Sequence, residues 1–326
     1  MQATKPALTA LFAVFVLFMA GPLAAQQDFP NQTIRLVMGY PAGVGGADSV
    51  ARSIAGYMKN LTNVPVIIEN KTGALTNIAA EYVANAKPNG YTLLVTAGNS
   101  TFATNMHLFK TLPFDPYKSF SYVTTLTRVP FVLMVSPKEK IATVQDLTRI
   151  LKAKGNKGSY GSSTPISLVI SELYKSIAGL ETVQIPYKTL EPAWPEMASG
   201  GLDFMFVDPA NAGIVMKQGR ARGIAVTSAQ RSALMPDIPT MIEGGVPGYE
   251  VTSWLAVYAP AGTPRPIIDK LNGWFNQVMA NDEFRKSMAS INYDLYPGTP
   301  EQLEKFHLSE LEKWGRLIRA AKIEPQ

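Results

Sequence analysis

The sequence contains no cysteine, and histidine occurs only at positions 107 and 307. The lack of cysteine excludes disulfide frameworks, thiolate zinc sites, iron–sulfur clusters and cysteine nucleophiles. No calcium-binding D-x-D-x-D-G loop occurs either. The formal net charge is +5, but no run of Lys and Arg reaches four residues, which argues against a nucleic-acid or lipid-headgroup surface. We therefore expect no metal, no cofactor and no nucleic-acid partner.

The common phosphate-binding and catalytic motifs are also missing. There is no G-x-x-x-x-G-K-[ST] and no G-x-S-x-G. Gly43 and Gly45 begin like a dinucleotide fingerprint, but Asp48 stands where its last glycine belongs, and an acidic side chain disfavours a pyrophosphate. Neither histidine accompanies a marked nucleophile, so both are interpreted as structural. These absences disfavour nucleotide binding and hydrolysis.

The N-terminus has the pattern of a secretory signal over residues 1–25. Lys5 precedes a largely apolar stretch from 7 to 19, which Gly21 and Pro22 end. The alternative is a transmembrane anchor, which needs about 20 apolar residues and is therefore disfavoured. We expect cleavage near Gln26 and export of the mature protein to the periplasm.

The length of 326 residues and the hydrophobic content of 46% allow one large or two ordinary domains. Strand-like and helix-like segments alternate, which is typical of βαβ units with mainly parallel sheets. The strands are expected at residues 33–40, 64–69, 91–96, 131–135, 159–161, 183–186, 202–206, 223–227 and 254–258. Helices are expected in the tail at 264–280, 282–290 and 299–321.

We predict two α/β lobes from this pattern. The second unit begins near residue 130, and a C-terminal helical block that returns to the first lobe makes that lobe discontinuous. The predicted division is 26–127 plus 253–326 for the first lobe and 128–252 for the second.

Two loops rich in glycine or hydroxyl groups join a strand to a helix start, at 40–48 and 161–165. Ligands of open α/β sheets bind at the carboxyl ends of strands, where helix N-termini present unpaired N–H groups. Glycine lets an anion approach the backbone, and serine and threonine add hydroxyl donors. The alternative is that the glycines only form a turn and Thr164 only caps a helix. Arg52 is expected to face solvent, since it lies roughly opposite Val50 on its helix.

The chain resembles the extracytoplasmic solute receptors of tripartite tricarboxylate transporters, the Bug-type periplasmic binding proteins. The resemblance covers nearly the whole mature chain in order. The matching stretches are IRLV at 34–37, YPAG at 40–43, GAD at 46–48, AR at 51–52, VIIENK at 66–71, PNGYTLL at 88–94, YGSS at 160–163, PYK at 186–188, GGLD at 200–203, AVTS at 225–228, PDIPT at 236–240, EGG at 243–245, PGYE at 247–250 and APAGTP at 259–264.

The resemblance implies a type 2-like periplasmic binding protein fold, in which two hinge strands join the lobes and the ligand lies between them. It implies a monomeric receptor that performs no chemistry, binds a small organic acid and delivers it to the integral membrane subunits of a transporter. Carried over by position, the ligand-binding residues are Tyr40, Ala42, Gly43, Val44, Gly45, Gly46, Asp48, Thr96, Ala97, Asn99 and Ser100 in the first lobe, with Gly161, Ser162, Ser163, Thr164, Tyr187, Lys188 and Asp208 in the second.

Three departures from the family pattern leave the ligand open. Tyr40 replaces the usual phenylalanine, Val44 interrupts a run that is often all glycine, and residues 162–165 replace a more glycine-rich stretch. Dicarboxylates, tricarboxylates, amino acids, nicotinate-like acids and aromatic acids all remain compatible. Two other functions stay open as well: a receptor of this fold that signals to a membrane sensor kinase, and a secreted hydrolase that uses a hydroxyl such as Ser163.

Overall fold

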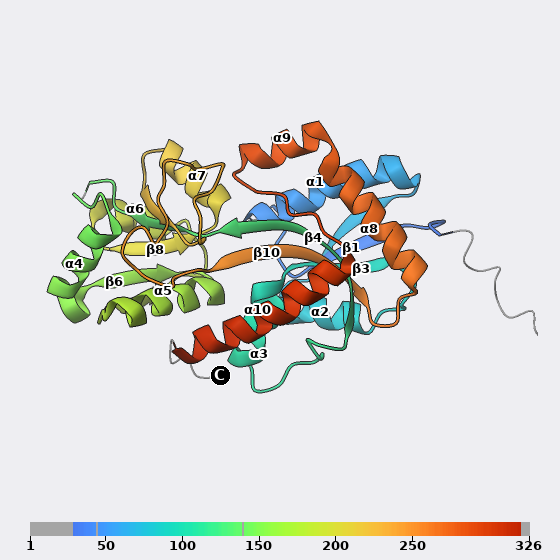
Figure 1. The fold of residues 1–326 in the computed structure, drawn as a ribbon, viewed down its shortest axis with the longest axis horizontal. Helices are drawn as coiled ribbons and strands as arrows, with labels where there is room; N and C mark the ends of the chain where they lie inside the picture. The colour runs from blue at the N-terminus through green and yellow to red at the C-terminus, as the bar shows by residue number, and fades with distance from the viewer. Residues whose placement is uncertain (1–28, 44, 139, 321–326) are drawn as a thin grey trace, which may run out of the picture.

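The computed structural model describes residues 29–43, 45–138 and 140–320, which form two α/β lobes side by side (Figure 1). A five-stranded sheet forms the centre of each lobe, and helices cover it. The expected signal segment 1–25 and Val44 lie outside the described residues. Within the part of the chain that is described, no helix has both the length and the apolar character needed to cross a bilayer.

The first sheet has the strand order β2-β1-β3-β10-β4. Its strands are β1 (Ile34–Met38), β2 (Val66–Asn70), β3 (Thr92–Ala97), β4 (Phe120–Pro130) and β10 (Thr252–Pro260). The helices of this part of the chain are α1 (Gly45–Thr62), α2 (Asn77–Ala84), α3 (Asn105–Leu108), α8 (Arg265–Ala280) and α9 (Asp282–Ser290), together with the short helices η2 (Ala74–Thr76) and η3 (Asn99–Thr104). The helix faces that carry Val50, Ile54 and Met58 on α1 and Leu271 and Phe275 on α8 are fully buried in one hydrophobic core.

The second sheet has the order β7-β6-β8-β5-β9. Its strands are β5 (Val132–Val135), β6 (Ser159–Ser162), β7 (Val183–Pro186), β8 (Phe204–Val207) and β9 (Arg222–Val226). The helices between them are α4 (Val144–Lys154), η4 (Gly155–Lys157), α5 (Pro165–Ala178), α6 (Ala193–Ser199) and α7 (Pro209–Lys217). Phe204 and Phe206 point into a core shared with Tyr174 of α5.

The expected alternation of strands and helices is confirmed, but the expectation of mainly parallel sheets is wrong. β1, β2 and β3 run parallel, as do β6, β7 and β8, whereas β10, β4 and β5 pair antiparallel with their neighbours. The sequence also gave no sign of β4. Thr124, Thr125 and Thr127 are buried within it, so polar residue types occupy positions where a strand pattern needs apolar ones.

Two short segments connect the lobes, one between β4 and β5 and one leading into β10. Thr227, which is fully buried, joins them. Its hydroxyl accepts a hydrogen bond from the Phe131 N–H at 2.8 Å and donates one to the Val251 carbonyl at 2.6 Å. Its backbone N–H and C=O also bond to Phe131 O and Val251 N, at 3.0 and 2.8 Å. One threonine therefore holds both connections side by side.

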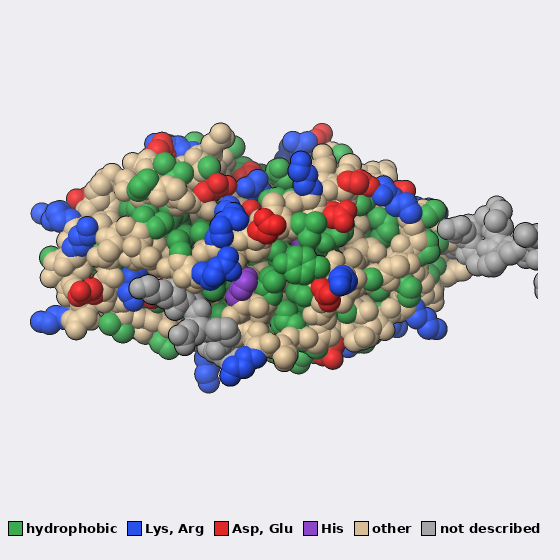
Figure 2. Space-filling model, turned by 60° about the horizontal axis from the view of Figure 1, so that its bottom comes forward, with side chains coloured by type: hydrophobic (Ala, Val, Ile, Leu, Met, Phe, Trp, Pro, Cys, Tyr) green, Lys and Arg blue, Asp and Glu red, His purple; other side chains and the backbone are tan. Residues whose placement is uncertain are grey.

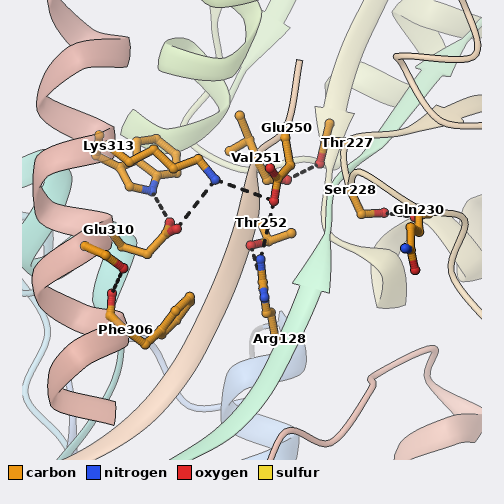
Figure 3. A network of polar contacts seen from close by, with 12 residues as sticks. Arg128, Thr227, Ser228, Gln230, Glu250, Val251, Thr252, Phe306, Glu310 and Lys313 are labelled. Carbon is orange, nitrogen blue, oxygen red and sulfur yellow. Dashed lines mark hydrogen bonds and ion pairs between the residues drawn. The ribbon is translucent and has the colours of Figure 1, made fainter. Parts of the chain in front are cut away.

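The C-terminal helix α10 (Pro300–Ala320) packs against β4 and η3 and also against α5, so it runs across both lobes (Figure 1). Figure 3 shows the polar contacts beside it. The Glu250 carboxylate lies 3.5 Å from Arg128 and 3.7 Å from Lys313, and Lys313 also contacts Glu310 at 3.5 Å. These partly exposed ion pairs are weak singly. Figure 2 shows acidic and basic side chains interspersed over one face of the molecule, as on a solvated surface.

His307 of α10 is a buried structural residue, as expected. Its Nδ1 lies 3.1 Å from the Tyr258 hydroxyl, which itself accepts a hydrogen bond from Trp254 Nε1 at 3.3 Å. The Tyr258 proton therefore points to Nδ1, and the neutral tautomer carries its proton on Nε2, 3.4 Å from the Pro116 carbonyl. Burial among aromatic rings lowers the pKa of the His307 imidazole to about 4.

Thr227→Val is expected to lower the free energy of unfolding by about 2–4 kcal/mol, because it leaves a buried N–H and a buried C=O without their side-chain partner. Denaturant unfolding measures the loss. Ser228→Ala is the matched control, since the neighbouring Ser228 hydroxyl bonds the Gln230 carbonyl at an exposed position (Figure 3). Equal losses in the two variants would contradict a special role for Thr227.

The low pKa of His307 predicts a pH-dependent stability. Between pH about 6.5 and about 4 the unfolded chain binds a proton at His307 that the folded chain does not, so acidification favours unfolding. This one residue should remove about 3 kcal/mol over that range, and its contribution should be fully present above pH about 6.5. Unfolding of the wild type and His307→Gln at pH 7, 6 and 5 measures it. The prediction fails if the variant keeps the wild-type slope.

Candidate functional site

The sheet topology brings the carboxyl ends of the parallel strands of both lobes to the face where the lobes meet. Thr252 pairs with Pro130 next to the connecting segments, and Ala97 at the end of β3 pairs with Leu255 close by. β1 runs parallel to β3 and so ends on the same side. In the second lobe Val132 pairs with Val207, and β6 runs parallel to β8. The loops after β1, β3, β6 and β8 therefore all start at the interlobe face.

The Asp48 carboxylate fixes the loop after β1 through hydrogen bonds. Asp48 is 1% exposed and accepts hydrogen bonds from Gly43 N at 2.8 Å, Arg52 Nε at 2.7 Å and Asn70 Nδ2 at 3.3 Å. Burial by itself raises the pKa of Asp48, but the hydrogen bonds from Arg52, Gly43 and Asn70 outweigh it and hold that pKa below its usual value. The Asp48 carboxylate is thus fully engaged with protein donors, while residues 41–43 and Gly45 of the same loop are exposed.

Arg52 has a role that its position on the helix did not indicate. Its side chain is 45% exposed, yet its guanidinium contacts both oxygens of Asp48 and also donates to Asn70 Oδ1 at 3.0 Å. Asn70 in turn donates to the Tyr40 carbonyl at 2.8 Å. Arg52 is therefore part of the support of loop 40–48 and not a freely solvated residue.

Tyr40, Thr96 and Ala97 are brought together as a support between the ends of β1 and β3. The Tyr40 hydroxyl accepts a hydrogen bond from the Ala97 N–H at 3.1 Å and lies 3.5 Å from Thr96 Oγ1. Burial raises the pKa of the Tyr40 phenol, which keeps its proton. Thr96 also bonds to the Thr101 hydroxyl. The hydroxyl that distinguishes Tyr40 from phenylalanine is consequently engaged with protein atoms.

Asn99 and Ser100 begin the π-helix η3, a rare element that occurs frequently at functional sites. Asn99 is fully buried, and its Oδ1 accepts a hydrogen bond from Ser253 Oγ at 3.1 Å. Its Nδ2 has no protein partner among the described residues. A buried amide N–H₂ without an acceptor is a donor that a ligand oxygen or a water can use.

The N-terminal end of α5 is capped by hydrogen bonds among its own first residues. The N–H groups of Ser163 and Thr164 both donate to Ser167 Oγ at 3.1 Å, and the Ser167 N–H donates to Thr164 Oγ1 at 3.1 Å. These reciprocal hydrogen bonds confirm the interpretation of Thr164 as the N-cap. Because Pro165 has no N–H, most of the donors at this helix end are occupied or missing. The Ser162 hydroxyl accepts from Gln184 Nε2 at 2.7 Å. The Ser163 hydroxyl has no protein partner within the described chain and remains the open donor.

A cavity of about 230 Å³ lies between the lobes, next to this helix start. Its lining residues come from the first lobe (Leu75, Leu108 and Phe109) and from the second (Ser162, Ser163, Thr164, Pro165, Leu168, Gln184 and Pro186). Of the predicted site residues, Ser162, Ser163 and Thr164 line it. A larger groove of about 850 Å³ bounded by Arg35, Tyr82 and Tyr91 belongs to the first lobe alone. The smaller cavity is favoured as the binding site because both lobes contribute to its lining.

The remaining predicted residues of the second lobe do not line this cavity. Gly161 is buried, and a side chain there would meet the Tyr187 ring at 3.1 Å. The Tyr187 hydroxyl donates to Glu196, and Lys188 is exposed. Asp208 caps α7, accepting from the N–H groups of the second and third following residues at 3.1 and 3.2 Å.

Several lining residues were missed by the sequence reasoning. Four of them belong to no recognisable motif: Leu75, Leu108, Phe109 and Gln184. Residues of these types are common in protein cores and on protein surfaces, so the sequence did not mark them as site residues. Tyr293 was missed as well, although its ring fills the space beside Gly46, where a side chain would come within 2.3 Å.

Comparisons with known proteins place the chain in a family. Residues 50–323 match the tripartite tricarboxylate transporter family receptor, TctC. The chain is 28% identical over 322 residues to Protein BugT of Bordetella pertussis, covering 96% of this chain and 97% of BugT. It is 32% identical over 300 residues to a UPF0065 protein in the tcbD-tcbE intergenic region of Pseudomonas sp. strain P51, covering 89% and 86%.

Solved structures agree. Rpa4515 of R. palustris, determined with adipate, superposes with a TM-score of 0.84 at 30% identity, over 92% of this chain and 100% of that one. The periplasmic binding protein BugD gives 0.80 at 29%, over 91% and 100%. MatC of Rhodopseudomonas palustris with bound malate gives 0.78 at 26%, over 89% and 100%. The chain belongs to the TctC family of tripartite tricarboxylate transporter receptors, with the two-lobed fold of periplasmic binding proteins, and is a solute-binding receptor and not an enzyme.

Proposed function

We propose that the protein binds a small carboxylate between its lobes in the periplasm and delivers it to the integral membrane subunits of a tripartite tricarboxylate transporter. The observation that carries the proposal is the cavity of about 230 Å³ lined from both lobes, in a chain of the TctC family. Two structural neighbours, Rpa4515 with adipate and MatC with bound malate, support the ligand class. The signal pattern at 1–25 supports the location.

The donors available at the interlobe face suit a carboxylate held without an ion pair. None of the residues that line the cavity is charged. The Ser163 hydroxyl, which lines the cavity, is an open donor of the second lobe, and the exposed start of α1 adds backbone N–H groups with the positive end of the helix dipole. Each charge-assisted hydrogen bond contributes roughly 1.5–3 kcal/mol, so two or three offset the desolvation of one carboxylate.

Thermal-shift and calorimetric titration of the purified mature protein test the ligand class. The set should contain dicarboxylates, tricarboxylates, amino acids, aromatic acids and uncharged sugars. A carboxylate at 100 times its Kd should raise the free energy of unfolding by about 2.7 kcal/mol. Tight binding of sugars with no binding of any acid would overturn the proposal. Delivery is tested separately, by uptake into cells with and without the transporter's membrane subunits.

The support of loop 40–48 predicts that Arg52→Ala weakens carboxylate binding by about 2–5-fold, the range expected for an ion pair with a half-exposed arginine. The cause is a looser loop, because Asp48 then loses the guanidinium that holds it against Gly43. Calorimetry of the folded variant measures the change. Arg149→Ala is the matched control, since Arg149 pairs with Asp146 on α4 with its side chain 73% exposed. Unchanged affinity in Arg52→Ala would show that loop 40–48 takes no part in binding.

A further inference from the structure

The segment that leads into α2 is held in a strained backbone conformation at the cavity. Gly73 has φ 125°, and the three non-glycine residues after it, Ala74, Leu75 and Thr76, have φ of 43°, 52° and 79°. The left-handed region is unfavourable for residues with a side chain, most of all for large or branched ones. Such strain persists only where the surroundings enforce it, and it clusters at ligand sites.

Contacts with neighbouring residues enforce this backbone conformation. Thr76 packs against the backbone of Gly39, where an added side-chain carbon would lie 2.5 Å from Thr76 Cβ. The Thr76 hydroxyl bonds Thr101 Oγ1 at 2.7 Å. The buried amide of Asn105 donates to the Leu75 carbonyl at 2.7 Å. With its carbonyl held inward, Leu75 presents its side chain outward, and that side chain is 43% exposed on the wall of the cavity.

The polar lining residues of the cavity all belong to the second lobe. Leu75, Leu108 and Phe109 supply a purely apolar wall from the first lobe, and Pro165, Leu168 and Pro186 add apolar surface from the second. The polar lining groups are confined to Ser162, Ser163, Thr164 and Gln184. A hydroxyl placed against the apolar wall would lose its water without gaining a partner.

We propose that Leu75 is a specificity-determining residue that selects carboxylates with an unsubstituted alkyl or aryl body over hydroxylated di- and tricarboxylates. The inference rests on the proposed function, since it names the ligand class for the same cavity. The carboxylate lies toward the hydroxyl groups of the second lobe, and the body of the ligand packs against the Leu75 side chain.

Calorimetry with five acids tests it: hexanoate, benzoate, adipate, malate and citrate. The wild type should bind at least one of the first three at least tenfold more tightly than malate and citrate. Leu75→Asn should weaken that binding about tenfold or more and narrow the preference, while the fold remains, because asparagine tolerates the left-handed region. Ile78→Asn is the matched control, since Ile78 is 46% exposed close by and does not line the cavity.

The outcomes separate the two proposals. Tighter binding of malate or citrate than of the other three acids, or equal effects of Leu75→Asn and Ile78→Asn, overturns the role of Leu75 and leaves the carboxylate receptor standing. Binding of none of the five acids or of any other carboxylate overturns the proposed function and this inference with it. If circular dichroism shows that Leu75→Asn is unfolded, Leu75→Gly takes its place, because glycine adopts the same φ without strain.

Discussion

The antiparallel pairing at the junction of the lobes is the constraint on which the binding site depends. β4 and β10 run side by side out of the first lobe, and β5 continues directly into the second sheet, where it pairs antiparallel with β8. Because these pairings fix the direction of the parallel strands in each sheet, the carboxyl ends of the parallel strands meet at the interlobe face. Thr227 keeps the two connections in register through four hydrogen bonds. A relative movement of the lobes has to bend this narrow junction and to change the other contacts between the lobes, such as the hydrogen bond from Asn292 Nδ2 to the Pro209 carbonyl at 3.4 Å.

Much of the polar chemistry at the interlobe face stabilises loops instead of facing a ligand. Asp48 holds loop 40–48, Tyr40 ties the ends of β1 and β3 together, Ser167 and Thr164 cap α5, and Asp208 caps α7. A receptor gains from this arrangement, since loops fixed before the ligand arrives lose less conformational entropy on binding. The donors left open are few, and a small number of fixed donors around an apolar cavity is what gives a pocket orientation and selectivity.

In the strained turn at 74–76 as well, the residues that fix the backbone differ from the residue that lines the cavity. Asn105, Thr101 and Gly39 contribute nothing to the cavity surface, yet they hold the backbone so that Leu75 stands in its wall. In α10 the neutral imidazole of His307 stabilises the packing of that helix, because its Nδ1 contacts the Tyr258 hydroxyl and its Nε2 contacts the Pro116 carbonyl.

The amino-acid sequence by itself determined the α/β alternation, the loops after β1 and β6 and the capping role of Thr164, because periodicity and capping are local properties of the chain. It also carried the family resemblance. It did not reveal β4, where the hydroxyl of the buried Thr124 donates a hydrogen bond to the Gly298 carbonyl at 3.0 Å. Nor did it reveal that Asn70 joins Arg52 and Asp48 in the support of loop 40–48, or that Leu75, Leu108 and Phe109 meet Gln184 across a cavity. Those facts come from residues far apart in the chain, and only the tertiary structure decides which side chains share a surface and which donors are already taken.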